Sequence, residues 1–349
     1  MIQSPLPSPQ SDPTPIVDVF RGSYATELLT AAVFEFRLFE ELSRKSLSFK
    51  QLCERTKLAV RPMNVLLTAM RAMGLISQNG EGEFTITPIA QEHLVSGGEF
   101  DMSGYVGLAS QSAGVKEMVQ RLRTNRPAGS DAGGPGVAYI YRNGIESAMD
   151  TEAGARRLTM ALAGRAKNVA PVLADRAPVA DARRLLDVGG GTGIYSFAML
   201  RKYPGLRAVI FDRAEVLKIA REFAVEYDVS NRTEFIAGDM FADPFPTDCD
   251  VMLLSNILHD WDVPECAALV QRCAAALPAD GKLLIHDVFL NDNLDGPLPA
   301  ALYSAALFSL TEGRAYSAAE YRKWLADAGL TPGEIIPTLI HCGVIAGKK

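Results

Sequence analysis

The chain lacks the features that mark several protein classes. It has only five cysteines and no Cys-x-x-Cys pair, so no disulfide framework is expected. No apolar run reaches the ~18 residues that a membrane span needs, and the proline-rich start has no basic segment followed by an apolar core, as a secretory signal would. The net charge is −6, which removes the general electrostatic case for nucleic acid or an anionic membrane. A cytoplasmic protein is expected.

The 349 residues change pattern along the chain in a way that predicts two folded domains. Residues 1–15 are rich in proline and serine, which predicts a disordered leader. Residues 16–100 predict a mainly helical domain, and residues 101–180 a helical linker that contributes to a substrate pocket. A glycine-rich loop at 127–136 interrupts this linker, and the sequence leaves open whether it closes over a ligand. Residues 181–349 predict the second domain.

The first domain has the pattern of a winged helix. Two short helical segments, Phe49–Thr56 and Pro62–Met73, precede a turn at Asn79-Gly80 that separates apolar runs at Ile76 and Phe84. Such a turn between two apolar runs predicts a β-hairpin. Two helices followed by a hairpin are typical of winged-helix domains.

The second domain alternates short β-rich runs with helical segments. Parallel strands need crossover helices, so this alternation predicts a parallel, doubly wound sheet of the Rossmann-like α/β class. The strands are expected at residues 185–188, 207–211, 233–236, 251–255 and 282–286.

A glycine-rich turn follows the first expected strand. It reads Asp187-x-Gly189-x-Gly191-x-Gly193, and glycine suits a tight turn from strand to helix where the backbone approaches a ligand. Nineteen residues later, Asp212 ends the second strand. An acid at this place can accept hydrogen bonds from both ribose hydroxyls of a nucleoside.

The end of the third strand continues this pattern. Gly238, Asp239 and Met240 place an acid beside apolar side chains, which suits an adenine whose amino group is bonded and whose faces are covered. Nicotinamide and flavin domains use a similar turn but favour Gly-x-Gly-x-x-Gly. The combination favours S-adenosylmethionine, with another nucleotide or a turn used only for packing as alternatives.

Four motifs stand in order along the chain: residues 185–193, Phe211-Asp212, Gly238–Phe241 and the Leu-His-Asp-Trp-Asp run at 258–262. With these motifs the chain resembles the small-molecule O-methyltransferases that include plant caffeate and bacterial polyketide enzymes. The resemblance covers nearly the whole chain, because that family carries an N-terminal winged-helix dimerisation domain. It implies S-adenosyl-L-methionine as cofactor, a small-molecule acceptor and a homodimer.

Deprotonation of an acceptor hydroxyl needs a base, and histidine has a pKa near neutrality. Of four histidines, His259 follows the fourth strand at the carboxyl edge of the sheet, where doubly wound folds bind ligands. The resemblance implies that His259 is the general base and that Asp287 supports it, where plant enzymes have glutamate. The family's further acid falls at Ala315, and the sequence leaves Glu312 or Arg314 open as substitutes.

Further residues around the expected site differ from the family pattern or are ambiguous. Ser255 stands where plant enzymes place a lysine near the cofactor, and we expect its hydroxyl to bond the methionine moiety. Asn256 is a candidate hydrogen-bond partner of the substrate, with a purely structural role as the alternative. Tyr303 and Phe308, on an apolar helix, are candidates for the acceptor pocket, although core packing is the default for that helix. His286 is expected to be a packed core residue, and no metal is expected because the later histidine of metal-binding relatives is missing.

The sequence offers two alternatives to an O-methyltransferase. Residues 1–100 contain nine Lys/Arg and eleven Asp/Glu, whereas a DNA reader needs a cationic stripe, so a dimerisation module is favoured over a DNA-binding regulator. A related fold can also carry another reaction. C- or N-methylation of a small metabolite, or a cofactor-binding relative with different chemistry, therefore stays open beside O-methylation of an aromatic or enolic hydroxyl compound.

Overall fold

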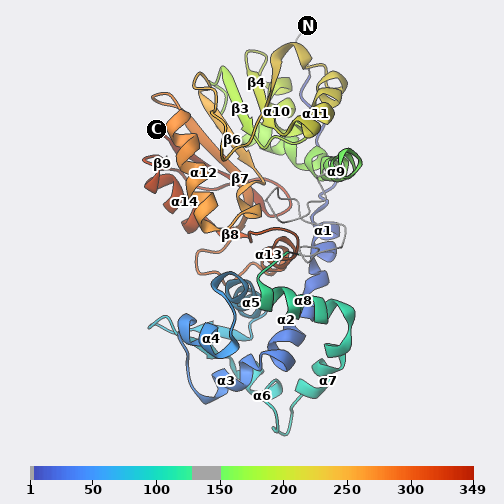
Figure 1. The fold of residues 1–349 in the computed structure, drawn as a ribbon, viewed down its shortest axis with the longest axis vertical. Coiled ribbons are helices and arrows are strands. Elements are labelled where there is room, and N and C mark those ends of the chain that lie inside the picture. The colour runs from blue at the N-terminus through green and yellow to red at the C-terminus, as the bar shows by residue number, and fades with distance from the viewer. Residues whose placement is uncertain (1–3, 128–150) are drawn as a thin grey trace. The chain divides into compact units, whose positions relative to one another are not determined.

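The structure is a computed structural model that describes residues 4–127 and 151–349 (Figure 1). These residues divide into two units. The sheet unit consists of residues 4–17, 151–289 and 318–349, and the helical unit of residues 18–127 and 290–317.

No helix within the described ranges is both long and apolar enough to cross a membrane.

The helical unit contains the predicted winged-helix pattern. Helices α4 (Phe49–Thr56) and α5 (Val60–Ala72) precede an antiparallel hairpin of β1 (Ile76–Gln78) and β2 (Phe84–Ile86). Ser48 caps helix α4. Its Oγ accepts the backbone N–H of Gln51, and the Gln51 side chain accepts the backbone N–H of Ser48. Two backbone donors at the start of the helix therefore have partners. The predicted helices and hairpin are confirmed here.

Helix α13 (Leu298–Leu310) also belongs to the helical unit, although it lies far along the chain. It packs against α5, and its Ala305 and Phe308 join the core of this unit. The remaining elements of the unit are α2 (Ala25–Thr30), α3 (Leu38–Arg44), α6 (Pro88–His93), α7 (Ser103–Gly107), α8 (Ala113–Thr124), η1 (Gly22–Tyr24), η2 (Ala31–Glu35), η3 (Leu108–Gln111) and β8 (Tyr316–Ser317), while α1 (Thr14–Arg21) crosses the boundary.

The sheet unit is built on the predicted parallel sheet. Its strands lie in the order β10-β11-β7-β6-β3-β4-β5; β3 to β7 are parallel and β11 runs antiparallel to β7. All five predicted strands are present, and the doubly wound α/β class is confirmed. The strands are β3 (Arg184–Val188), β4 (Arg207–Asp212), β5 (Thr233–Ala237), β6 (Val251–Ser255), β7 (Lys282–Leu290), β9 (Thr331–Pro332), β10 (Ile336–Pro337) and β11 (Cys342–Lys348).

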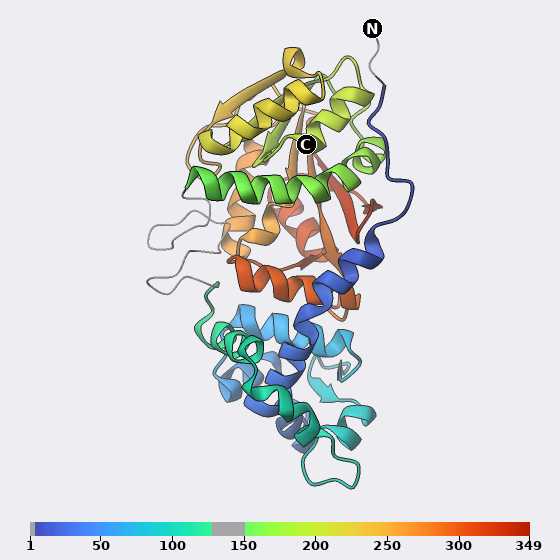
Figure 2. The ribbon, with the colours of Figure 1, turned by 90° about the vertical axis from the view of Figure 1, so that its right-hand side faces the viewer.

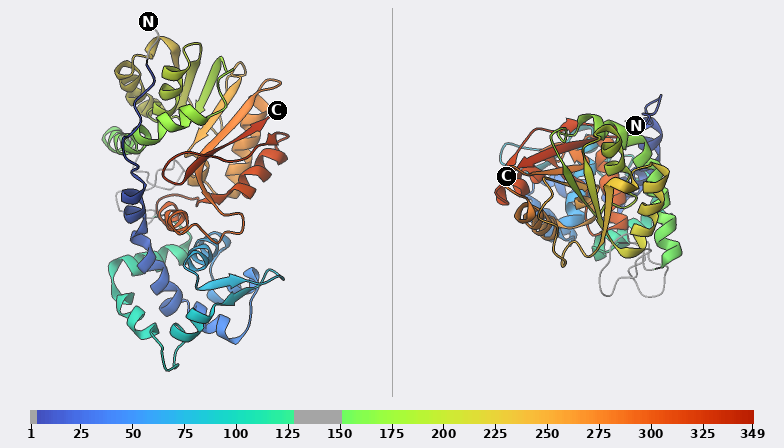
Figure 3. Two further views of the ribbon diagram at one scale, coloured as in Figure 1. Left: turned by 180° about the vertical axis from the view of Figure 1, so that it is seen from behind. Right: turned by 90° about the horizontal axis from the view of Figure 1, so that it is seen from above.

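Helices cover both faces of this sheet. Helices α9, α10 and α11 pack together on one face, where α9 crosses the strands (Figure 2). Helices α12 and α14 pack together on the other face, and the view from above places the strands between the two layers (Figure 3). The bounds are α9 (Glu152–Arg176), α10 (Ile194–Lys202), α11 (Ala214–Glu226), α12 (Val263–Ala276) and α14 (Ala318–Asp327), with short turns η4 (Ser230–Arg232) and η5 (Leu258–Asp260).

This division differs from the domain boundaries expected from the sequence. Helix α9 falls in the predicted linker at 101–180, yet its Ala163, Ala166 and Ala170 are buried in the core of the sheet unit. Leu6 also packs against that core, although residues 1–15 were expected to be disordered. Apart from its first residue, the predicted loop at 127–136 lies outside the described residues.

Candidate active site

The predicted site residues gather at one edge of the sheet. Because β3 to β7 are parallel, their carboxyl ends lie along the same edge. The strand order β5-β4-β3-β6-β7 then fixes the order of the residues. Asp239 follows β5, Asp212 ends β4, and the glycine turn follows β3; His259 follows β6, and Asp287 lies on β7.

The glycine turn has the backbone that its composition predicts. Gly189, Gly191 and Gly193 have φ values of 68°, 57° and 74°, in the left-handed region that glycine adopts without steric cost. The Gly191 N–H donates to Asp212 Oδ2 at 2.8 Å. This bond ties the turn after β3 to the end of β4, so the two parts of the predicted cofactor site are held together.

Asp187, at the start of this turn, is buried and bonded to the following helix. Its side chain is 1% exposed, and its Oδ2 accepts the Ser196 hydroxyl at 2.6 Å. Burial raises the pKa of the Asp187 carboxyl to about 7, against the effect of the Ser196 bond. The geometry therefore links β3 to α10, while a direct contact with the cofactor stays a prediction.

The segment after β5 is shaped by local contacts. A Cβ on Gly238 would lie 2.5 Å from the Cζ of Phe211, so a larger residue would force the ring to move. Asp239 Oδ1 accepts the N–H of Phe241 at 2.8 Å, which fixes the turn. Asp239 and Met240 are both partly exposed at this edge, as an adenine site there would require.

His259 and Asp287 form a buried pair. His259 Nδ1 lies 2.5 Å from Asp287 Oδ1, and the two residues are 5% and 1% exposed. A carboxylate can only accept here, so Nδ1 carries the proton and Nε2 the lone pair. The Nε2 atom lies 3.7 Å from Asp260 Oδ1. The structure thus brings together the two residues predicted to be catalytic.

Local contacts hold His259 in place. It lies in the one-turn helix η5, whose Leu258 carbonyl accepts the Cys266 thiol at 3.1 Å. Asp287 Oδ1 also accepts the N–H of Val288 at 2.8 Å. A side-chain bond therefore fixes the residue before His259, and a backbone N–H fixes Asp287.

The charges around the pair set its protonation. Burial disfavours the imidazolium, but the charge of Asp287 and then that of Asp260 outweigh burial and raise the pKa of His259. Burial likewise opposes ionisation of Asp287, yet His259 lowers the pKa of that carboxyl. Burial raises the pKa of Asp260 to about 6. The Asp287 carboxylate thus stabilises the cationic form of His259.

Ser255 is engaged with a neutral histidine. Its Oγ shares a hydrogen bond with His286 Nδ1 at 2.9 Å, and His286 Nε2 shares one with Thr338 Oγ1 at 3.2 Å. Burial, followed by the charge of Arg165, lowers the pKa of His286 to about 3. His286 is thus a packed residue with both ring nitrogens bonded, and the role of Ser255 toward the cofactor stays a prediction.

Asn256 adopts a left-handed backbone at the end of β6, with φ of 58°. Its Oδ1 accepts from Arg165 Nη1 at 2.6 Å, and its Nδ2 donates to Ser255 Oγ at 3.0 Å. Arg165 Nη2 also donates to Cys342 Sγ at 3.0 Å. These bonds join α9, β6 and β11 at the carboxyl edge.

The other predicted residues belong to the helical unit. Phe308 is fully buried, with the guanidinium of Arg61 4.8 Å from its ring centroid, which favours core packing. The guanidinium of Arg21 lies 3.7 Å from the ring centroid of Tyr303. Arg314 Nη1 donates to the Ala315 carbonyl. Among the described residues of the helical unit, these contacts do not show whether Glu312 or Arg314 substitutes for the family's further acid.

Three residues near the pair were not predicted. Tyr321 on α14 donates its hydroxyl to Asp287 Oδ2 at 3.0 Å, and Arg165 and Asp260 contribute charge. Asp260 could have been found, because it adjoins His259 in the quoted motif. Tyr321 and Arg165 have no fixed sequence spacing from the motifs, so only the packing of α14 and α9 places them.

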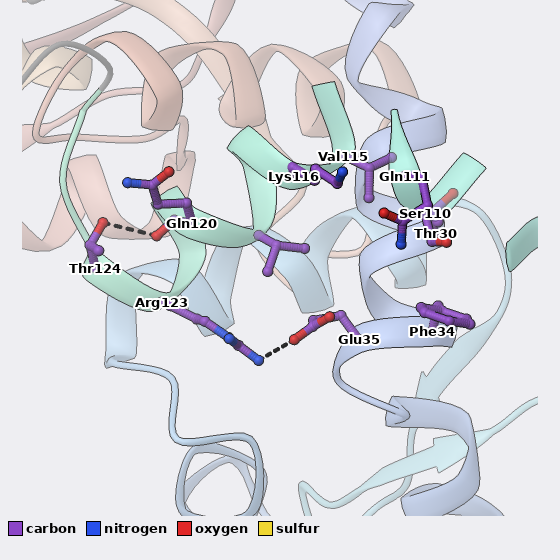
Figure 4. Close-up of a pocket in the computed structure, with 11 residues that line it drawn as sticks. Thr30, Phe34, Glu35, Ser110, Gln111, Val115, Lys116, Gln120, Arg123 and Thr124 are labelled. Carbon is purple, nitrogen blue, oxygen red and sulfur yellow. Dashed lines mark hydrogen bonds and ion pairs between the residues drawn. The ribbon is translucent and has the colours of Figure 1, made fainter. Parts of the chain in front are cut away.

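A separate hollow of about 400 Å³ lies on the helical unit (Figure 4). Residues of α2, η2, η3 and α8 line it, including Phe34 and Val115, and Arg123 forms an ion pair with Glu35 beside it. The predicted site residues are not among those that line it.

Comparison with known proteins decides which family has this geometry. A model of the O-methyltransferase domain matches residues 133–331. The chain is 33% identical over 350 residues to a 3-hydroxy-5-methyl-1-naphthoate 3-O-methyltransferase of Streptomyces sahachiroi, covering 99% of this chain and 98% of that protein. The chain belongs to the O-methyltransferase family. It is an S-adenosylmethionine-dependent O-methyltransferase.

Solved structures agree with this assignment. An O-methyltransferase family 2 protein from Planctomyces limnophilus, in complex with apigenin, is 48% identical with a TM-score of 0.90, covering 100% of this O-methyltransferase and 99% of that chain. Human N-acetylserotonin methyltransferase in complex with S-adenosylmethionine is 20% identical with a TM-score of 0.61, over 99% of each chain. The latter likeness concerns the fold.

The residues at the sheet edge fit S-adenosylmethionine. The left-handed glycines bring backbone to the carboxyl end of β3, and Asp212 offers a carboxylate beside it. Asp239 lies one strand further. Ribose hydroxyls would be held by Asp212 and an adenine by the segment at Asp239, while β6 and β7 carry the His259–Asp287 pair.

We predict that Asp212→Ala weakens the binding of S-adenosylmethionine at least about tenfold, because hydrogen bonds to a charged group contribute roughly 1.5–3 kcal/mol. Isothermal titration calorimetry measures this affinity. Asp248→Ala is the control, since Asp248 is a mostly exposed carboxylate paired with Arg184 at the opposite end of β3. Equal affinities of the two variants would contradict the placement of the cofactor.

Proposed function

We propose that His259 is the general base that removes the proton from the acceptor hydroxyl during methyl transfer. The observation that carries this proposal is the buried bond of 2.5 Å between His259 Nδ1 and Asp287 Oδ1. It leaves the lone pair on Nε2, which is the atom that would take the proton. Such a base contributes on the order of 10²–10⁴-fold to a rate.

Each residue of the site would have one defined role during methyl transfer. When bound, S-adenosylmethionine supplies a methyl group on a sulfonium, which is already activated for displacement. Asp287 holds the imidazole in the tautomer with Nδ1–H and stabilises the cation formed when Nε2 receives the proton. Burial of the pair strengthens this electrostatic effect, since the site has a lower dielectric than water.

We infer that the acceptor is a small aromatic or enolic compound with a hydroxyl group. Support comes from the relatives, which act on a hydroxylated naphthoate or bind apigenin according to their names. The raised pKa of His259 also makes its neutral imidazole a stronger base, which favours proton removal from a phenolic or enolic hydroxyl. The proposed place of action is the cytoplasm.

We further propose a homodimer formed through the helical unit. Tyr105 and Leu108 are 72% and 77% exposed, and Phe34 lies next to Gly107, since a Cβ there would be 3.1 Å from its ring. Monomeric proteins seldom leave a contiguous apolar patch in water. A second copy of this chain is the proposed partner.

Sedimentation equilibrium of the full chain tests this assembly. We expect a mass near twice that of one chain, and we expect Leu108→Asp to shift the equilibrium toward the monomer because it places a charge in the apolar patch. Lys50→Asp, at an exposed polar site of the same unit, should leave the mass unchanged. A monomeric wild-type protein would rule out the dimer.

Substitution of the base gives the most direct test of the catalytic proposal. His259→Ala should lower turnover at least about a hundredfold, because proton removal is lost, while the affinity for S-adenosylmethionine changes little. Turnover by mass spectrometry and binding by calorimetry separate these two effects. Unchanged turnover would exclude His259 as the base.

The pH dependence tests the pairing of His259 with Asp287. The base acts in its neutral form, so kcat/KM rises with pH through the pKa of His259, which is raised above its usual value of 6.5. Asp287→Asn removes the main cause of that rise and leaves burial, so the acid limb should move to lower pH while the plateau falls roughly tenfold or more. The exposed Asp280→Asn should keep the wild-type profile. An acid limb that stays in place in Asp287→Asn would refute the coupling.

A further inference from the structure

Asp287 has two oxygens, and each has a different partner. Oδ1 faces His259 Nδ1 at 2.5 Å, and Oδ2 accepts the Tyr321 hydroxyl at 3.0 Å. All three side chains are almost fully buried, since Tyr321 is 0% exposed and Asp287 1%. A buried carboxylate with both oxygens bonded cannot rotate without breaking a hydrogen bond. A buried polar group left without its hydrogen bond costs free energy of folding.

The phenol of Tyr321 is itself held by packing. Its ring lies edge-on to Phe289 with centroids 5.2 Å apart and edge-on to Trp324 at 5.4 Å. Such ring pairs favour one orientation. Tyr321 is near the start of α14, while Phe289 lies on β7 two residues beyond Asp287. The donor is therefore fixed to the same strand as the carboxylate that it holds.

We propose that Tyr321 is a positioning residue, which holds the Asp287 carboxylate in the rotation that receives the His259 N–H. This inference rests on the proposed role of His259 as the base. Tyr321, on α14, would then be the third residue of the site beside His259 and Asp287. The position of the family's further acid is occupied by Ala315, which carries no acid. In this role the hydroxyl acts on His259 through Asp287.

The proposal has a consequence for the basicity of the pair. A hydrogen bond from Tyr321 withdraws charge from Asp287, and a carboxylate with fewer donors stabilises a neighbouring imidazolium more strongly. Loss of the hydroxyl should therefore raise the pKa of His259. Among the described residues, the other charged groups that act on His259 include Asp260 from η5 and Arg165 from α9, and the neutral His286 from β7 acts on the same cluster. These groups are unchanged by the test.

The experiment compares Tyr321→Phe with Tyr227→Phe. The first keeps the ring and removes only the hydroxyl. The second removes a hydroxyl from a tyrosine that stacks on Phe223, and its helix α11 packs on β4 and β5, whereas the strand order places β7 beyond β3 and β6. Three quantities are measured: kcat, the pH profile of kcat/KM, and the titration and tautomer of His259 by ¹⁵N NMR in the protein without substrate.

For Tyr321→Phe we expect kcat to fall on the order of tenfold and the acid limb to move up by about half a pH unit. The ¹⁵N signals of His259 should follow this shifted titration while the neutral imidazole keeps the Nδ1–H form, because Asp287 still accepts from it. Tyr227→Phe should match the wild type in all three quantities. A fall in kcat with unchanged His259 titration and tautomer would mean a purely structural role and overturn the proposal.

Site-specific replacement of Tyr321 by 3-fluorotyrosine gives a test of opposite sign that keeps the hydroxyl. The fluorophenol is a stronger donor, so the pKa of His259 and the acid limb should move down. A shift upward, or none, would contradict the proposal even if Tyr321→Phe failed to fold. His259→Ala separates the two levels: full activity of that variant refutes the base itself, whereas its loss of activity beside an unaffected Tyr321→Phe refutes only the role of Tyr321.

Discussion

The parallel pairing of β3 to β7 is the constraint on which the site depends. Each strand is followed by its polar residues, and parallel pairing brings the carboxyl ends to one edge. The strand order then separates the residues along that edge, with the predicted nucleoside residues at the ends of β5, β4 and β3, and the His259–Asp287 pair after β6 and on β7. Reversal of a single strand would remove its residue from the edge, even if every side chain were kept.

Local signals in the sequence predicted the parts of the structure that local interactions decide. The five strands and the winged-helix pattern follow from periodicity and turn residues, whereas the pairing of His259 with Asp287 was implied by the family resemblance. The same signals could not place α9 or α13, because an alanine-rich or wholly apolar helix shows that it is buried but not against which partner. Tyr321 was missed for a related reason, since the packing of α14 beside β7 brings it to Asp287 from 34 positions away.

The site places an unusual number of polar groups in the interior. Asp187, His259, His286 and Asp287 are each less than 9% exposed, and each has a hydrogen-bond partner within 3 Å. Removing one partner from such a set leaves the other buried and unsatisfied, which costs more than the bond itself contributes. This explains why these buried groups have hydroxyl partners: Ser196 bonds Asp187, Ser255 and Thr338 bond His286, and Tyr321 bonds Asp287.

The raised pKa of His259 has a consequence for the range of compounds that the O-methyltransferase could turn over. Because the pKa of His259 is raised, a smaller share of the enzyme offers the Nε2 lone pair at a given pH than would be so with an ordinary histidine. An acceptor whose hydroxyl ionises readily would react as the anion, and the imidazolium form of His259 would balance its charge. A weakly acidic alcohol would instead depend on the neutral form of His259, which the raised pKa makes less abundant. Acidity of the hydroxyl, in addition to shape, would therefore act as a filter on substrates.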